Sequence, residues 1–512
     1  MNKAFSVVAA LLGILLSIYA IIEISSDPGQ GIVKAVRAVA LVFLPVAFTK
    51  PRIGLYGVFF ALANIEWLKR YAIFYGDVSI WSVASTLVLP LALFSAVILG
   101  TLMGSFVGAT KMTLLRFFWF AFAAVVILGI IGIKGTSPHS IQIALNSGLY
   151  IAIIPVALML FKDQQDLMKL FNVCAVIFSP WAVVAIYQYF NGYSDVDWYY
   201  ARTGISPVFS KTMLSEAGSR PYGLAGSSPS FAAISFLAWY MLWKAIYVKD
   251  KRMLAWGLAG LFLFSLFISG YRTASVSPVI TLIGYRLFKS RNGLILTYSS
   301  GMGAAILMVV FSQHLLDNLK TYDTALKGLN SSSEWWQKTV SVSTWSDRLR
   351  GYNRLKDPEA WSFFGKEIEG GYKTSTGQLN VNSRDYSHDL INVALKNIGV
   401  VGLVLVSAVL FIAFIKLHGL VLKLPPGPAQ EFATMGLSYS LLKMVLSVTG
   451  GGNFNVAPTA TFTWLFFAAI VMAGREVPLL KKKGSNQEQE SEVSADEVIS
   501  ITPSRLQNPS LG

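Results

Sequence analysis

The sequence predicts an all-α polytopic membrane protein with about 12–14 transmembrane helices and a large periplasmic loop domain before the last three spans. Three observations predict this class. Of the 512 residues, 54% are apolar and only 13% are charged, whereas a soluble chain carries roughly 25% charged residues. The apolar residues come in runs of about 20, the length with which a helix crosses a bilayer core. The single cysteine, Cys174, excludes a disulfide-stabilised fold.

Fourteen apolar runs are candidate spans. They are Ala4–Ile24, Ile32–Phe48, Ile53–Ile65, Val78–Gly100, Leu114–Ile133, Ile141–Leu160, Met168–Phe190, Ser230–Val248, Met253–Ser269, Thr273–Phe288, Leu294–Ser312, Leu390–Leu417, Phe432–Val448 and Phe454–Ala473. No small-residue cleavage site follows the first run, so we expect a retained helix rather than a signal peptide. The third run is short, and the count falls to twelve if it is re-entrant and another pair is misread.

Basic residues in the connections predict the orientation. The even-numbered connections carry most of them, beginning with Lys50 and Arg52, whereas the short odd-numbered connections offer little beyond Lys69, Arg70 and Lys134. Because cytoplasmic loops are enriched in Lys and Arg, we expect the even connections and both termini to be cytoplasmic. This topology accounts for much of the formal net charge of +15 and favours a lipid bilayer, not nucleic acid, as the partner.

Two long connections fall on the predicted outer side and divide the chain. We expect N-terminal transmembrane helices over 1–190, a periplasmic loop over 191–228, transmembrane helices over 229–312, a large periplasmic loop over 313–388, C-terminal transmembrane helices over 389–473 and a disordered cytoplasmic tail over 474–512. The large loop contains the tryptophans Trp335, Trp336, Trp345 and Trp361. These aromatic residues fit either a packed cap on the helices or a surface on which sugars stack.

Several Lys and Arg residues lie within predicted spans. Such positions are unfavourable, because a Lys or Arg at the centre of the bilayer costs about 2.5–3.5 kcal/mol on insertion scales. Lys34 and Arg37 lie three residues apart in the second span, on one helix face. They fit either side chains that snorkel to the outer interface or the basic lining of an outward cavity. Lys443 interrupts the thirteenth span and is a further, isolated signal of the same kind.

Two arginines stand in short, defined turns at the predicted outer side. Arg272 follows Tyr271 in the tight turn between the ninth and tenth spans, so its guanidinium stays near the outer mouth of the helices. Arg220 begins an Arg-Pro-Tyr-Gly stretch, in which Pro and Gly favour a fixed turn. Both residues fit anion-binding groups. Arg348 and Arg350 in the large loop are secondary candidates, for which a solvated helix face is the simpler interpretation.

His388 lies where the large loop returns to the membrane, beside Asp389. A histidine with an ordinary pKa near 6.5 can act as a general base at neutral pH. No cluster with the ligand spacing of a zinc site surrounds it, so we expect no metal. The remaining alternative is an ordinary histidine at the membrane interface.

The segment from His388 onward resembles the signature of the O-antigen ligase and polymerase superfamily. In that signature a His-Asn pair is followed by Gly at +11 and +14, which Gly399 and Gly402 match, while Asp389 stands for the Asn. Asn392 and Asn397 stand where the family has an apolar residue and often Glu. The resemblance extends to the turns that hold Arg220 and Arg272, to an Arg348…Trp361…Gly365 pattern, and to the order of these elements.

The resemblance implies a metal-independent and cofactor-free, inverting glycosyl transfer at the periplasmic face of the bacterial inner membrane. The implied donor is a glycan on undecaprenyl diphosphate, and the acceptor is a glycan or glycolipid. Arg220 and Arg272 would bind the diphosphate, and His388 would deprotonate or orient the acceptor hydroxyl. We expect Gly399 and Gly402 to let another helix approach closely and so to fix the height of the histidine.

The acceptor decides between two activities of this family. A polymerase adds the growing polysaccharide (O-antigen, capsule or exopolysaccharide) to another lipid-linked unit, and a ligase attaches it to lipid A core. We favour the polymerase slightly, with other polysaccharide assembly proteins as possible partners. A flippase or transporter for the lipid-linked glycan is the alternative of another class, with the arginines lining a path. The long tryptophan-bearing loop before His388 argues against it.

Overall fold

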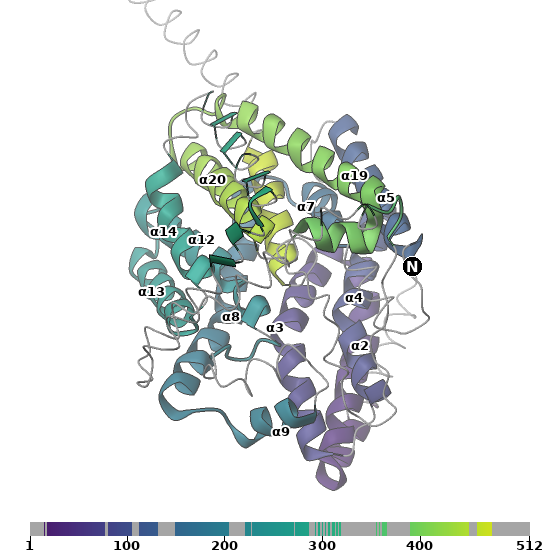
Figure 1. The fold of residues 1–512 in the computed structure, drawn as a ribbon. Helices are drawn as coiled ribbons and strands as arrows, with labels where there is room; N and C mark the ends of the chain where they lie inside the picture. The colour runs from purple at the N-terminus through teal and green to yellow at the C-terminus, as the bar shows by residue number, and fades with distance from the viewer. Residues whose placement is uncertain are drawn as a thin grey trace, which may run out of the picture.

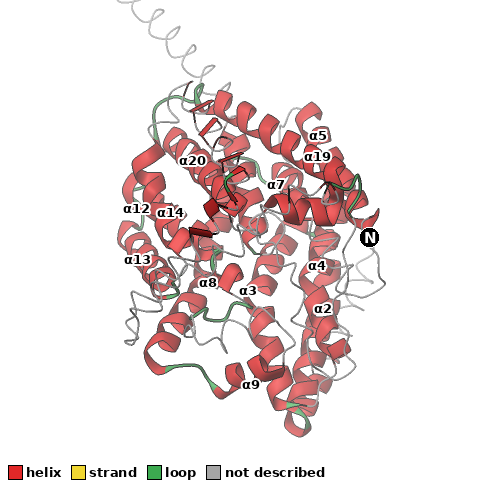
Figure 2. Cartoon of the chain, viewed as in Figure 1, coloured by secondary structure: helices red, strands yellow, loops and turns green. Residues whose placement is uncertain are grey.

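The computed structural model describes residues 18–76, 80–104, 112–131, 149–203, 221–226, 228–270, 272–285, 390–449 and 458–473, with scattered positions at 15, between 292 and 318 and between 355 and 365. Within these ranges all regular structure is helical and no strand occurs (Figure 2). The all-α class is therefore confirmed for the described part of the chain.

The first described helices are α2 (Pro28–Thr49), α3 (Pro51–Tyr75) and α4 (Ile80–Met103), which pack together (Figure 1). Asp27 caps α2, because its carboxylate accepts a 3.0 Å hydrogen bond from the backbone N–H of Gln30. Glycine makes the helix contacts close. A Cβ atom at Gly100 of α4 would lie 2.0 Å from the carbonyl oxygen of Phe48 in α2.

The middle of the chain forms α5 (Met112–Ile131), the short helix η1 (Tyr150–Ala152) that continues as α7 (Ile153–Leu160), and the long α8 (Gln164–Asn191). Asp163 caps α8 by accepting from the N–H of Asp166, and Gly192 ends it with a φ of +82°. The indole of Trp181 in α8 donates a 2.8 Å hydrogen bond to the carbonyl of Ala63 in α3. This bond connects α8 with α3.

A short helix, α9 (Asp195–Thr203), follows α8 and contacts α3. It lies at the end of the helices where α3 and α8 finish, which is the lower end in Figure 1. We call this the α9 end. Under the predicted orientation it is the outer side of the membrane, because α3 and α8 both begin after connections rich in Lys and Arg.

The second group comprises α11 (Ser228–Phe231), α12 (Ile234–Tyr247), α13 (Arg252–Ile268) and α14 (Arg272–Gly284). The C-terminal group comprises α19 (Leu390–Val421), α20 (Pro428–Thr449) and a last helix over Thr459–Ala473. Rings from α8, α12, α20 and the last helix form one aromatic core. Its members include Phe171, Phe178, Phe236, Trp239, Phe432, Tyr439, Phe462 and Phe466.

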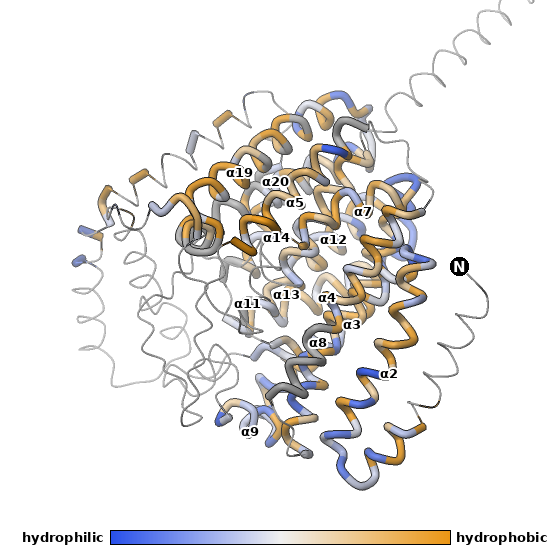
Figure 3. The backbone as a smooth tube through the Cα atoms, turned by 90° about the vertical axis from the view of Figure 1, so that its right-hand side faces the viewer, coloured by the Kyte–Doolittle hydropathy of each residue, from blue (hydrophilic) through white to orange (hydrophobic). Residues whose placement is uncertain are grey.

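Within the described part of the chain, three helical segments are long and apolar enough to cross a membrane, namely Pro28–Thr49, Gln164–Asn191 and Ile398–Val421. Shorter apolar helices are Leu89–Met103, Leu115–Ile131, Tyr150–Leu160, Arg252–Ile268 and Thr459–Ala473. Figure 3 shows the apolar residues running along the helices and hydrophilic ones gathering around α9. These lengths are those of an all-α membrane protein, whereas the number of spans and the side of the large loop stay predictions.

The structure corrects the third predicted span. We expected a short run at Ile53–Ile65, but α3 continues to Tyr75. The sequence assigned Lys69 and Arg70 to a connection because their charge interrupts the apolar run. In the structure both are buried in α3, where acidic partners balance them.

The structure also corrects the predicted role of Gly399. This residue breaks α19 with a φ of +68°, and a Cβ atom there would lie 2.4 Å from the carbonyl oxygen of Phe363. The close neighbour is therefore loop backbone and not another helix. Beyond the break, the N–H of Val400 donates 2.9 Å to the carbonyl of Ser362, and that of Val401 donates 3.3 Å to Phe363. At Gly402 the nearest atoms belong to Ile398 on the other side of the break.

We predict that Gly100→Ala destabilises the protein by about 1–3 kcal/mol, because the added methyl group overlaps the backbone of α2. The matched control is Gly257→Ala in α13, where nothing lies within 4 Å of the added Cβ. The unfolding temperature of the purified protein in detergent measures both changes. Equal temperatures for the two variants would contradict the close packing of α2 and α4.

Candidate functional site at the α9 end

Most of the predicted site residues lie outside the described residues. They are Arg220, Tyr271, Arg348, Arg350, His388 and Asp389, while Arg272 is described only through its backbone, as the first residue of α14. The segments that adjoin Arg220, Arg272 and His388 are described. Their contacts define the surroundings of the candidate site.

A buried ion pair joins α3 to α9. The Nη1 atom of Arg70 lies 2.8 Å from Oδ1 of Asp197, and the two side chains are only 3% and 9% exposed. The Nε2 atom of Gln188 in α8 donates 3.2 Å to the other carboxylate oxygen of Asp197. Buried charges are tolerated when paired and hydrogen-bonded in this way. The pair therefore fixes α9 against both long helices.

The same arginine holds the turn that follows Arg220. Its guanidinium donates to the carbonyl of Gly223 at 3.3 Å and to the carbonyl of Ala225. From the other side, Oε1 of Gln188 accepts from the N–H of Gly223 at 2.8 Å. The turn's backbone is thus bound through both its donors and its acceptors.

Gly223 meets a steric requirement in this turn. Its φ is +58°, and a Cβ atom would lie 2.0 Å from the carbonyl oxygen of Trp181. Beside it, the ring of Tyr222 stacks on Tyr193 with centroids 5.5 Å apart, and the Arg70 guanidinium lies 5.2 Å from the Tyr222 centroid. Burial raises the pKa of the Tyr222 phenol, so this ring stays neutral. The expected fixed turn after Arg220 is present in residues 221–226.

A second ion pair lies next to the first. Lys69 pairs with Glu66 one turn earlier in α3, and its ammonium lies 5.4 Å from the centroid of Tyr200 in α9. The carboxylate of Glu66 would collide with a Cβ atom at Gly226, at 2.5 Å. Burial raises the pKa of the Tyr200 phenol. Glu66 and Lys69 therefore add a charged contact between α3, α9 and the end of the turn.

Lys443 lies within the helices on α20 and is 3% exposed. Its ammonium is 5.7 Å from the ring centroid of Phe236 and 5.5 Å from that of Tyr439. The hydroxyl of Tyr439 is 2.7 Å from that of Ser235, the second residue of α12. Since α12 begins shortly after the Arg220 turn, Lys443 lies in the half of the helices nearer the α9 end.

Aromatic contacts connect the turn with Lys443. Trp181, whose carbonyl faces Gly223, packs edge-on against Phe178 with centroids 4.9 Å apart. Phe178 contacts Phe462 at 5.4 Å, and Phe462 in turn contacts Phe236 at 6.3 Å. This continuous packing means that the turn cannot move without disturbing the surroundings of Lys443.

Lys34 and Arg37 lie in the first half of α2, whose start packs against the end of α3 at Gly76. The ammonium of Lys34 is 2.7 Å from a carboxylate oxygen of Glu23 and donates 3.3 Å to the hydroxyl of Tyr19. The side chain of Arg37 is exposed. The charge of Lys34 is therefore balanced locally by Glu23, which the sequence analysis did not single out.

The contacts among Arg70, Gln188 and Asp197 were not predicted from the sequence. The sequence predicts one loop over 191–228, although Asp197 carries a charge that a buried arginine requires. A helix predicted through Tyr75 would have placed Glu66 and Lys69 one turn apart as a pair. Arg70 would then have needed an acidic partner from elsewhere in the chain.

Among the described residues, no group of His, Cys, Asp and Glu is arranged to hold a metal ion. Comparison with known protein families, with curated proteins and with solved structures finds no match.

We predict that Arg70→Gln lowers the free energy of unfolding by about 3–5 kcal/mol, because it leaves the carboxylate of Asp197 buried without its cation. Lys169→Gln is the control, since Lys169 makes a 3.3 Å pair with Asp166 and its side chain is 69% exposed. That change should cost about 1 kcal/mol or less. Denaturant titrations of both variants in detergent provide the comparison. An Arg70→Gln variant as stable as the control would show that this pair does not hold the site.

Proposed function

We propose that this protein is a polysaccharide polymerase of the inner membrane. It transfers a glycan from undecaprenyl diphosphate to a sugar hydroxyl of an acceptor at the periplasmic face, without a metal ion. The proposal rests on the resemblance around His388 and on the surroundings of the two arginine-bearing segments.

The observation that carries the proposal is the fixed turn after Arg220, together with the position of Arg272. α12 follows this turn and α14 begins at Arg272, with α13 running between them in the opposite direction. α12 and α14 are in contact and run the same way, so their first residues share the α9 end. Two guanidinium groups on these segments suit a diphosphate, because the planar fork of arginine matches phosphate oxygens.

Lys443 supports the same assignment. A charged residue inside a membrane-spanning helix is costly and is by default a functional candidate. α20, which carries it, contacts α12, α14 and α19. The amine of Lys443 lies near Phe236 of α12 and, when protonated, would add positive charge on the helices that follow the two arginine-bearing segments.

His388 precedes α19, which begins at Leu390 and contacts α20. In the proposed reaction its imidazole takes the proton of the acceptor hydroxyl. The oxygen attacks the anomeric carbon of the donor sugar from the face opposite the diphosphate, and the bond to the diphosphate oxygen breaks with inversion. Arg220 and Arg272 stabilise the charge that develops on the leaving diphosphate.

The decisive experiment uses purified protein in nanodiscs with a defined undecaprenyl-diphosphate oligosaccharide. A ladder of products without lipid A core identifies a polymerase, whereas a single transfer that requires added core identifies a ligase. Donor that crosses a vesicle membrane without glycosyl transfer identifies a carrier and contradicts the proposal.

We predict that His388→Ala lowers the transfer rate by at least about 100-fold, the scale of a lost general base, while the protein remains folded. His314→Ala is the matched control, because His314 is exposed and its Nε2 atom lies 3.1 Å from the side-chain amide of Asn318. Rates come from gels of the lipid-linked product. Normal ladders from His388→Ala would remove its catalytic assignment.

We also predict that Arg272→Ala loses more transfer activity than Arg272→Lys. Lysine keeps the positive charge but not the planar fork that binds two phosphate oxygens. The KM for the lipid-linked donor should rise in both variants. If both variants transfer at the wild-type rate, Arg272 is only an interfacial anchor.

A further inference from the structure

The outward face of α9 is largely exposed. Asp195, Trp198, Tyr199 and Arg202 follow the spacing i, i+3, i+4, i+7 and so share one face of this helix. The buried side of the same helix is formed by Val196, Asp197, Tyr200 and Ala201. Tyr199 is 48% exposed although the ion pair of Asp197 already secures the helix. Trp198 is half-buried against the hydrophobic core, whereas Asp195, Tyr199 and Arg202 are exposed.

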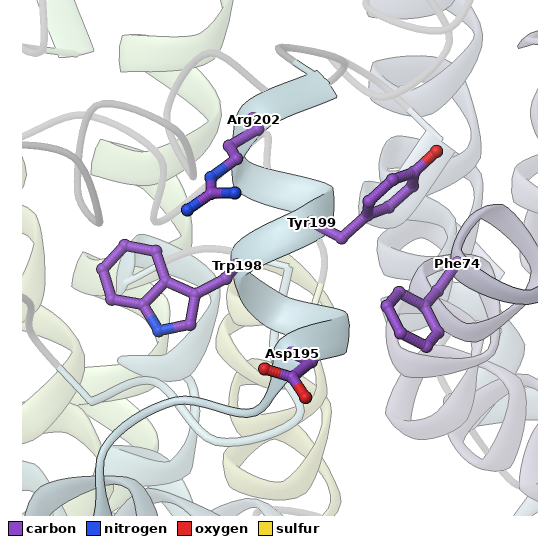
Figure 4. Close-up of a pocket in the computed structure, with 5 residues that line it drawn as sticks. All are labelled: Phe74, Asp195, Trp198, Tyr199 and Arg202. Carbon is purple, nitrogen blue, oxygen red and sulfur yellow. The ribbon is translucent and has the colours of Figure 1, made fainter.

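This face lines a hollow of about 370 Å³, completed by Phe74 of α3. In Figure 4, Trp198 and Arg202 lie on one side of α9, and Tyr199 lies on the side of Phe74. Two contacts fix the rings. Tyr199 meets Phe74 edge-on with centroids 5.5 Å apart, and Trp198 meets Tyr193 edge-on at 5.9 Å. The hollow thus has aromatic walls that are oriented before any ligand binds.

We propose that this hollow binds sugar residues of a glycan. A sugar ring presents apolar C–H groups on its faces and hydroxyl groups at its rim. Aromatic rings suit the faces, and the carboxylate of Asp195 and the guanidinium of Arg202 suit the hydroxyls as acceptor and donors. A few polar groups among aromatic walls are typical of a small-molecule site. The type of glycan rests on the proposed function, whereas the site rests on these residues.

Membrane anchoring explains this face less well than glycan binding. Exposed rings that mark the interface already occur at the end of α8, where Tyr187 is 59% and Phe190 is 69% exposed. α9 begins after Gly192, beyond these rings, and places Asp195 and Arg202 on the same face as its aromatic residues. A carboxylate on that face disfavours contact with lipid tails.

The hollow is also connected to the turn after Arg220. Trp198 packs on Tyr193, and Tyr193 stacks on Tyr222 within the turn. Two ring contacts therefore separate the wall of the hollow from the segment proposed to hold the diphosphate. Because these contacts link the hollow to the turn after Arg220, we assign the hollow to sugars of the donor chain.

The test measures binding of a free oligosaccharide to full-length protein in nanodiscs by calorimetry. The probe is the repeat-unit oligosaccharide released by acid from the lipid-linked donor, which lacks both diphosphate and lipid. Trp198→Ala and Tyr199→Ala should each weaken binding about tenfold, the scale of a lost aromatic contact and its buried area. Trp256→Ala and Tyr187→Ala are the controls, since these rings are 43% and 59% exposed on α13 and α8. Both controls should bind like the wild type.

The outcomes separate this inference from the proposed function. Binding that is lost in the Tyr199 variant but kept in both controls supports the hollow, even if the wild type forms no polysaccharide ladder. Wild-type protein that does not bind the oligosaccharide overturns the inference, even if it forms a ladder. Equal weakening in the control variants also overturns it, because the rings of α9 would then have no special role.

Discussion

The buried pair of Arg70 and Asp197 is the interaction on which the candidate site depends. It brings a helix from the first quarter of the chain into contact with α9 and, through Gly223 and Ala225, with the turn after Arg220. Gln188 of α8 joins the same group, because it binds both the carboxylate of Asp197 and the backbone of the turn. Because these contacts share atoms, the loss of one partner leaves several buried polar groups unsatisfied at once.

The two sides of α9 differ in burial. On the inner side of α9, charges and the Tyr200 and Tyr222 rings are buried and fix the backbone. On its outer side, Trp198 and Tyr199 remain accessible. A rigid inner layer lets the outer layer keep one shape without a ligand, and preorganised sites bind with a smaller loss of conformational freedom. The stability of the buried pair and the affinity of the hollow are therefore linked.

Hydropathy predicted most of the helices but not what connects them. Runs such as Met168–Phe190 correspond to helices within a few residues of the predicted limits, because a long apolar stretch leaves few alternatives. The prediction failed at α3, where Lys69 and Arg70 resemble the end of a span when the sequence is read alone. The burial of Arg70 depends on Asp197, more than a hundred residues later, and no local pattern contains that contact. Lys69 instead pairs with Glu66 in the same helix. The turn after Arg220 was predictable from Pro221 and Gly223, whereas the arginine and glutamine that hold it were not.

The bend in α19 depends on contacts with a loop segment. A helix interrupted at Gly399 leaves the N–H groups of Val400 and Val401 without their usual carbonyl acceptors, and Ser362 and Phe363 supply the replacements. If that loop segment were detached, the two amides would lose their acceptors in a region where water is scarce. A continuous helix would then be the less costly conformation. The bend in α19 is therefore held by a segment outside the helix itself.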